Sequence, residues 1–174
     1  METQRPPVDP IFDGVEIGIG TWAWGDRLVW GYGNKYREED IIQAFKESIE
    51  NDVVFFDTAE VYGQGKSELF LGKMIPGSQY PVRIATKIMP FPWRIGKNAL
   101  RNALSGSLTR LKLDQVDLYQ MHWPLPLLPV EHWMDQMAAV KHEGLIKAIG
   151  VSNYDLAQTI KSVTELKKHG VNLA

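Results

Sequence analysis

The feature that most constrains the fold is a fivefold alternation of short apolar runs with longer amphipathic stretches. The short runs are typical of buried strands, and the longer stretches carry apolar residues at helical spacing. The predicted strands are 15–20, 53–56, 82–86, 116–121 and 146–150, and the predicted helices are 37–51, 67–74, 96–111, 129–142 and 155–169. Strict alternation of this kind predicts a parallel sheet with right-handed helical crossovers.

Two architectures share this alternation, an open doubly wound sheet and a (β/α)₈ barrel. Doubly wound dinucleotide-binding folds usually carry G-x-G-x-x-G after the first strand. Here that turn reads Gly18-Ile19-Gly20-Thr21-Trp22-Ala23 and lacks the third glycine. The missing fingerprint leaves both architectures open, and the placement of polar residues at the strand ends favours the barrel.

Composition and length exclude several classes of function. The 174 residues carry 19 Lys and Arg against 21 Asp and Glu, so no basic excess points to nucleic acid or an anionic membrane. Cysteine is absent, which excludes disulfides, thiolate metal sites and cysteine nucleophiles. The four histidines include no H-E-x-x-H and no i, i+4 pair, so no zinc site is expected.

The same survey predicts one domain over residues 1–174, with no linker and no second composition. The segment 1–7 lacks the basic and apolar regions of a signal peptide, and no apolar run is long enough to span a bilayer. We therefore expect a cytoplasmic protein, or a plastid protein if a transit peptide has been removed.

Chemistry-bearing side chains follow the predicted strands. Asp57 comes directly after the second strand, with Tyr62 five residues on, while Lys87 ends the third strand and His122 the fourth. The carboxyl ends of parallel strands converge on one mouth, where barrel enzymes place their chemistry. A tyrosine hydroxyl is a poor acid at neutral pH unless a cation such as Lys87 lies nearby. Asp57 could hold that lysine, and His122 could orient a carbonyl oxygen.

Taken singly, each residue also has an ordinary structural explanation. Asp57 would cap a turn, Lys87 would be a solvated strand end, and Tyr62 would anchor a loop. His122 would be a structural histidine, and Ser152-Asn153 would cap the last helix. The coincidence of these side chains at one end of consecutive strands favours the functional interpretation.

Longer stretches of the sequence resemble the aldo-keto reductase family. The matching segments are Gly20-Thr21-Trp22, Phe56-Asp57-Thr58-Ala59-Glu60-Val61-Tyr62-Gly63, Ser67-Glu68-x-x-Leu71-Gly72, Ala85-Thr86-Lys87, Leu108-x-Arg110-Leu111, Val116-Asp117-Leu118-Tyr119-x-x-His122-Trp123 and 144–153. The resemblance extends from about Val15 to Ala174 in order and spacing. The tryptophan-rich loop 22–31 looks most like a cyanobacterial or plant-plastid branch, some of whose members reduce pyridoxal.

The resemblance implies a (β/α)₈ barrel that reduces aldehydes and ketones, its small-molecule substrates, to alcohols with NADPH. Tyr62 would be the proton donor, Lys87 and Asp57 would tune it, and His122 would polarise the carbonyl. The cofactor-binding residues implied by the family pattern are Thr21, Trp22, Asp57, Ser152 and Asn153. The candidates for the substrate pocket wall are Trp22, Trp24, Trp30, Trp93 and Trp123.

The resemblance stops short at the end of the chain. A barrel of this type needs roughly 250 residues, and five βα units are about five eighths of it. In the family, the later units carry a glutamine under the nicotinamide, an aromatic residue on its ring and the phosphate-binding loops. We therefore expect this chain alone to bind NADPH poorly and to be weakly active or inactive. The alternatives are a non-catalytic binding or regulatory module and a half-barrel that self-associates through exposed sheet edges.

Overall fold

A computed structural model describes residues 9–125 and 127–174, and its centre is a five-stranded parallel sheet. The strands are β1 (Gly18–Gly20), β2 (Phe55–Asp57), β3 (Arg83–Ile88), β4 (Val116–Met121) and β5 (Ile146–Val151), and they pair in sequence order. The predicted number, order and direction of the strands are confirmed. The segment 1–7, which we predict not to be a signal peptide, lies outside the described residues.

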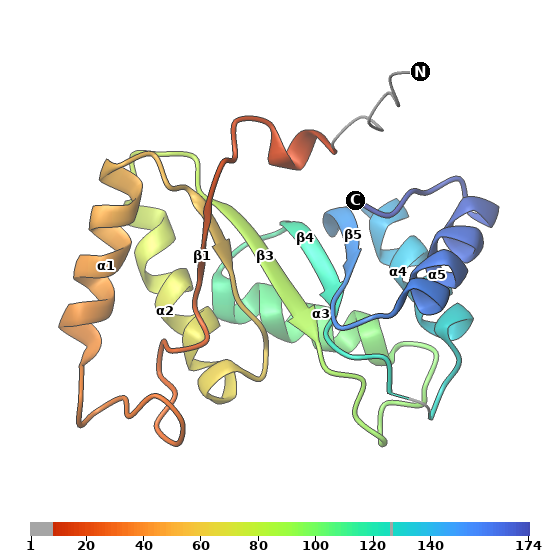
Figure 1. Cartoon of the computed structure of the whole chain (residues 1–174), viewed down its shortest axis with the longest axis horizontal. Coiled ribbons are helices and arrows are strands. Elements are labelled where there is room, and N and C mark those ends of the chain that lie inside the picture. Colours follow the sequence, from red (N-terminus) through yellow and green to blue (C-terminus); the bar gives the residue numbers. More distant parts are fainter. Residues whose placement is uncertain (1–8, 126) are drawn as a thin grey trace.

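Five helices make the crossovers between and after the strands. They are α1 (Glu38–Glu50), α2 (Lys66–Met74), α3 (Ala99–Leu111), α4 (Val130–His142) and α5 (Leu156–Lys168), with short 3-10 turns η1 (Pro10–Phe12), η2 (Tyr62–Gly65) and η3 (Ile75–Gly77). Figure 1 shows α1 and α2 to one side of the sheet, α3 behind it, and α4 and α5 to the other side. No helix in the described part of the chain is both long and apolar enough to cross a membrane.

Two clusters of apolar side chains hold the sheet in place. The larger one fills the space between the sheet and the helices, with Phe56, Ile84 and Tyr119 contributed by the strands. The smaller one lies on the other strand face and is covered by the N-terminal segment around Ile11. Arg83 fixes that segment, because its guanidinium donates to the Ile11 and Asp13 carbonyls at 2.8 and 2.7 Å. The amino ends of the strands are therefore closed by side chains and the N-terminal turn.

The start of β2 differs from the prediction. Val53 and Val54 precede the strand, and pairing begins at Phe55 opposite Gly18 and Arg83. The reason is the end of α1, where the Val53 N–H donates back to the Ser48 carbonyl at 2.9 Å and Asp52 is left-handed (φ 61°). The capping bonds of the helix take the first valine out of the strand.

The N-cap of α5 is not Ser152 or Asn153, which we considered as caps of the last helix. The Asp155 side chain accepts from the Gln158 N–H at 2.8 Å, and the Gln158 side chain accepts from the Asp155 N–H at 3.0 Å. Asp155 is therefore the N-cap, in a reciprocal capping box. Ser152 and Asn153 lie ahead of the helix and are available for other contacts.

Among the residues that the structure describes, the outer edge of β1 is unpaired and that of β5 is paired at one point. β1 pairs with β2, and β5 pairs with β4 and, through a single parallel bridge, with Leu173. The Ala174 N–H donates to the Ile149 carbonyl at 2.9 Å. The C-terminal residues thus lie where a sixth strand would pair, and the sheet is a partial rather than a closed barrel.

Candidate active site

Lys87 is the centre of the site at the carboxyl ends of β2, β3 and β4. Its Nζ donates to Asp57 Oδ2 at 2.5 Å and to the Thr58 carbonyl at 2.8 Å, and it lies 3.4 Å from Tyr62 Oη. Asp57 Oδ1 accepts from Gln120 Nε2 at 3.2 Å, so both carboxylate oxygens have partners. The ammonium group is therefore buried, neutralised by Asp57 and aimed at the Tyr62 hydroxyl.

Tyr62 is held against this lysine by contacts of its aromatic ring and by the conformation of the turn that follows it. The Lys87 Nζ lies 4.9 Å from the centre of the Tyr62 ring, and the His122 ring stands edge-on to it at 5.5 Å. The turn after Tyr62 places Gly63, Gln64 and Gly65 in left-handed conformations. A side chain at Gly63 would come within 2.8 Å of the Gly25 backbone, so only glycine fits there.

His122 lies at the end of β4 in a buried position. The backbone N–H of His122 donates to the Ile88 carbonyl at 2.9 Å, and its backbone carbonyl accepts from Asn153 Nδ2 at 2.8 Å. Burial, and after it the nearby Lys87 ammonium, lower the pKa of His122 from 6.5 to about 4. The imidazole is thus neutral at pH 7, with one ring nitrogen that donates and one that accepts.

Ser152 and Asn153 follow β5 next to His122. The Ser152 N–H donates to the Met121 carbonyl at 2.9 Å, and Asn153 Nδ2 donates to Ser152 Oγ at 3.0 Å. Among the described residues, these contacts leave the Ser152 hydroxyl hydrogen as a donor and Asn153 Oδ1 as an acceptor. A primary carboxamide needs that pair of partners, so the two side chains fit the amide of a nicotinamide.

Thr21 and Trp24 are the two buried side chains among the candidates of the loop after β1. Thr21 is fully buried, and its hydroxyl lies 3.0 Å from the Asp57 carbonyl and 2.7 Å from Ser67 Oγ. Trp24 is only 6% exposed and packs on Phe56 in the core between sheet and helices. Both side chains are therefore buried, and the cofactor contact expected of Thr21 and the pocket wall expected of Trp24 stay predictions.

The remaining candidate tryptophans are exposed on loops. Trp22 lies 6.2 Å from the Tyr62 ring, nearly parallel to it, and meets Trp30 edge-on at 5.7 Å. Trp123 directly follows His122 and is half exposed, and Trp93 is 71% exposed on the loop after β3. The structure therefore brings Trp22 to Tyr62 and Trp30 to Trp22, and it leaves Trp93 largely exposed.

Comparison with known proteins decides the family. The model of the Aldo/keto reductase family matches residues 16–173, almost the whole chain. The chain belongs to the aldo/keto reductase family. It is 40% identical over 171 residues to the chloroplastic pyridoxal reductase of Arabidopsis thaliana. This alignment covers 90% of the present chain and 46% of the plant protein.

Solved aldo-keto reductases share the fold. The thermostable enzyme Tm1743, crystallised with the inhibitor epalrestat, aligns with a TM-score of 0.74 at 34% identity, over 85% of this chain and 53% of its own. An aldo/keto reductase of Klebsiella pneumoniae, crystallised with NADP and acetate, aligns with a TM-score of 0.72 at 29% identity, over 87% and 50%. This aldo/keto reductase chain thus spans about half the length of the relatives it matches.

Sequence reasoning missed two residues of this aldo/keto reductase site. Gln120 binds Asp57 from β4, and Ser67 lies 2.7 and 2.8 Å from the hydroxyls of Thr21 and Thr58. The alternation of side chains along a strand could have found Gln120, because it is two residues before His122 and shares its face. No pattern in the sequence points to the Ser67 contacts, which depend on how α2 packs.

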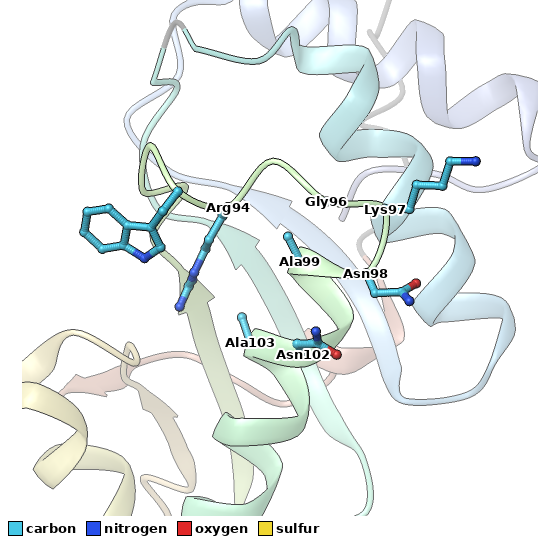
Figure 2. Close-up of a pocket in the computed structure, with 8 residues that line it drawn as sticks. Arg94, Gly96, Lys97, Asn98, Ala99, Asn102 and Ala103 are labelled. Atoms are coloured by element: carbon cyan, nitrogen blue, oxygen red, sulfur yellow. The ribbon is translucent and has the colours of Figure 1, made fainter.

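Two other polar features of this aldo/keto reductase include none of the four catalytic candidates. A hollow of about 570 Å³ is lined by the loop after β3, with Trp93 and Arg94, and by the first turns of α3. Figure 2 shows the residues that line it. Asp135, Glu165 and His169 gather on α4 and α5, where a metal ion could bind. Ion pairs already use these groups, because His169 contacts Asp135 at 2.8 Å and Lys168 contacts Glu165 at 2.5 Å.

Proposed function

We propose that this chain carries the proton-donating half of an NADPH-dependent reductase of aldehydes and ketones. The observation that supports it most is the position of Lys87, which binds Asp57 and lies 3.4 Å from the Tyr62 hydroxyl. A buried cation beside a tyrosine offsets the negative charge that develops on the oxygen as the hydroxyl gives up its proton. The neutral His122 ring against the same tyrosine adds a hydrogen-bond donor for the carbonyl oxygen.

The proposed reaction divides the work among these side chains. A bound nicotinamide cofactor supplies a hydride to the carbonyl carbon. His122 donates a hydrogen bond to the carbonyl oxygen and holds it beside Tyr62. The Tyr62 hydroxyl gives its proton to that oxygen as the C=O bond becomes C–O, which yields the alcohol. Lys87 stabilises the tyrosinate left behind, and Asp57 keeps the lysine in place until solvent returns the proton.

The cofactor is proposed as NADPH on two grounds. The donor and acceptor left on Ser152 and Asn153 match a carboxamide, and the related Klebsiella pneumoniae structure contains NADP. The chain spans about half the length of these relatives, so the proposal concerns the part of a cofactor site that would face the nicotinamide.

The first substrate to test is an aromatic aldehyde such as pyridoxal. The plant relative is named a pyridoxal reductase. The exposed Trp22 beside Tyr62, with Trp30 edge-on to it, suits a flat ring.

The test is NADPH oxidation, followed by absorbance, with millimolar NADPH and an aromatic aldehyde. We expect a rate in the wild type that depends on both NADPH and the aldehyde. Tyr62→Phe should lower it by about 10²-fold or more because the proton donor is gone. The matched control is Tyr80→Phe, which changes an exposed tyrosine in the segment between η3 and β3. It should leave the rate unchanged. Equal rates in the Tyr62 and Tyr80 variants would contradict the proposal.

The open sheet edges favour one second candidate, a half-barrel that self-associates. Ile17, next to β1, is 64% exposed, and β1 presents an unpaired edge. Exposed strand edges pair readily with other chains. Sedimentation velocity over a hundredfold range of concentration should show a dimer that dissociates on dilution. A monomer over the whole range would count against this candidate.

A further inference from the structure

Glu60 is the buried charge of the site region that the proposed reaction does not use. It lies on the segment between Asp57 and Tyr62, and its side chain is 7% exposed. The carboxylate accepts from the Met89 N–H at 2.7 Å and binds Arg94 through both oxygens, with Nη1 at 2.5 Å and Nη2 at 2.9 Å. Three donors from one short segment thus converge on a single carboxylate.

The segment that supplies these donors is the mouth turn, residues 89–94, which leaves the carboxyl end of β3. It closes on itself, because the Met89 carbonyl accepts from the Phe91 N–H at 2.8 Å and from Arg94 Nη1 at 2.9 Å. Pro90 and Pro92 restrict its backbone further. With Glu60 in place, the turn has few alternative conformations.

The mouth turn carries an aromatic stack. The Phe91 and Trp93 rings lie parallel, with centres 4.6 Å apart, and the Arg94 guanidinium lies 5.4 Å from the Phe91 centre. Trp93 is largely exposed although it is stacked, so its outer face is open to a ligand. Figure 2 shows the Arg94 side chain pointing away from Lys97 and Asn98, which continue toward α3. The Arg94 side chain is thus directed to Glu60 and not along the segment that leads into α3.

We propose that Glu60 is a positioning residue, which through Arg94 and the Met89 N–H holds the mouth turn so that the Phe91–Trp93 stack forms a preformed wall for a flat, ring-bearing substrate. A carboxylate that receives a bidentate guanidinium and a backbone N–H is fixed in direction as well as charge. Preforming the wall removes the ordering cost that a mobile loop would add to binding. The substrate part of this inference rests on the proposed function, and the positioning part does not.

The positioning part is tested by limited trypsin digestion, because the turn contains its own cleavage site after Arg94. The measured quantity is cleavage after Arg94 relative to cleavage after Lys46, inside α1, read by mass spectrometry. Glu60→Gln keeps the shape and removes the charge, and we expect the ratio to rise about tenfold as the turn opens more often. Glu60→Asp keeps the charge and should give a smaller rise, which tests the point even if Glu60→Gln folds poorly.

The matched control is Glu143→Gln, which breaks the exposed ion pair with Arg101 and should leave the ratio unchanged. An unchanged ratio in both Glu60 variants would overturn the inference.

The substrate part is tested by selectivity, the kcat/KM for an aromatic aldehyde divided by that for a short aliphatic one. We expect Glu60→Gln to lower this ratio about fivefold, mainly by raising KM for the aromatic substrate. Increased cleavage with unchanged selectivity would refute the wall. If no turnover depends on Tyr62, the reductase proposal fails, and the trypsin ratio still decides whether Glu60 holds the turn.

Discussion

At the scale of single residues, the site depends on where charge is placed. Lys87 and Asp57 neutralise each other. The ammonium group of Lys87 also lies within 3.4 Å of the Tyr62 hydroxyl. The sequence was sufficient to predict this pair, because strand ends in a parallel sheet converge. It could not separate Trp22 from Trp24, which lie two residues apart in a turn whose path no periodicity describes. The structure buries Trp24 and exposes Trp22.

The lowered pKa of His122 makes the stability of the chain depend on pH. In the folded chain the ring stays neutral down to about pH 4, whereas in the unfolded chain it gains a proton near pH 6.5. The unfolded state therefore binds more protons between these values, and the free energy of unfolding falls as the pH is lowered through this window. Other groups titrate in the same range, so a comparison with a variant is needed.

We expect His122→Gln to lose less stability than the wild type between pH 7.5 and pH 5 in urea denaturation. The control is His142→Gln, on an exposed position at the end of α4. It should keep the pH dependence of the wild type. Parallel pH profiles for the wild type and His122→Gln would show that burial of this histidine is not what the structure indicates.

At the scale of elements, the helices and strands follow from sequence patterns, while their contacts do not. Each predicted element exists, and β4 matches its predicted bounds. β3 extends two residues further than predicted, to Ile88, because pairing with β4 continues through Lys87 and Gln120. Such extension depends on the neighbouring strand, so a single run of residues cannot reveal it.

Gly72 shows how one contact fixes two elements. A side chain at this position of α2 would lie 2.1 Å from the Arg110 carbonyl and 2.8 Å from the Leu111 carbonyl carbon, so α2 and α3 meet backbone to backbone. Gly72→Ala should lower the free energy of unfolding by about 1–3 kcal/mol, as overpacking does. Gly77→Ala, where a side chain meets nothing within 4 Å, is the control and should change it little. Thermal or urea denaturation gives both values, and equal effects would contradict the packing.

At the scale of the whole molecule, the chain is an open sheet that carries all four of the proposed proton-transfer residues. The two edges, β1 and β5, stand where a closed barrel would have neighbours. The alternation of elements left two architectures open, the polar residues at the strand ends favoured the barrel, and the family resemblance supplied the count of five units against eight. What no count could supply is the arrangement at the mouth, where residues from four strand ends and η2 lie within contact of one another.

We propose that Tyr62 of this chain donates the proton while a bound nicotinamide would deliver hydride to the same carbonyl group. The direct measurement is mass spectrometry of the alcohol formed from an aromatic aldehyde during long incubation with NADPH deuterated at the transferable position of C4. We predict that the wild type forms alcohol with one deuterium on the carbinol carbon, and that Tyr62→Phe forms no more than a protein-free blank. Alcohol without deuterium, or equal amounts from both proteins, would contradict the account.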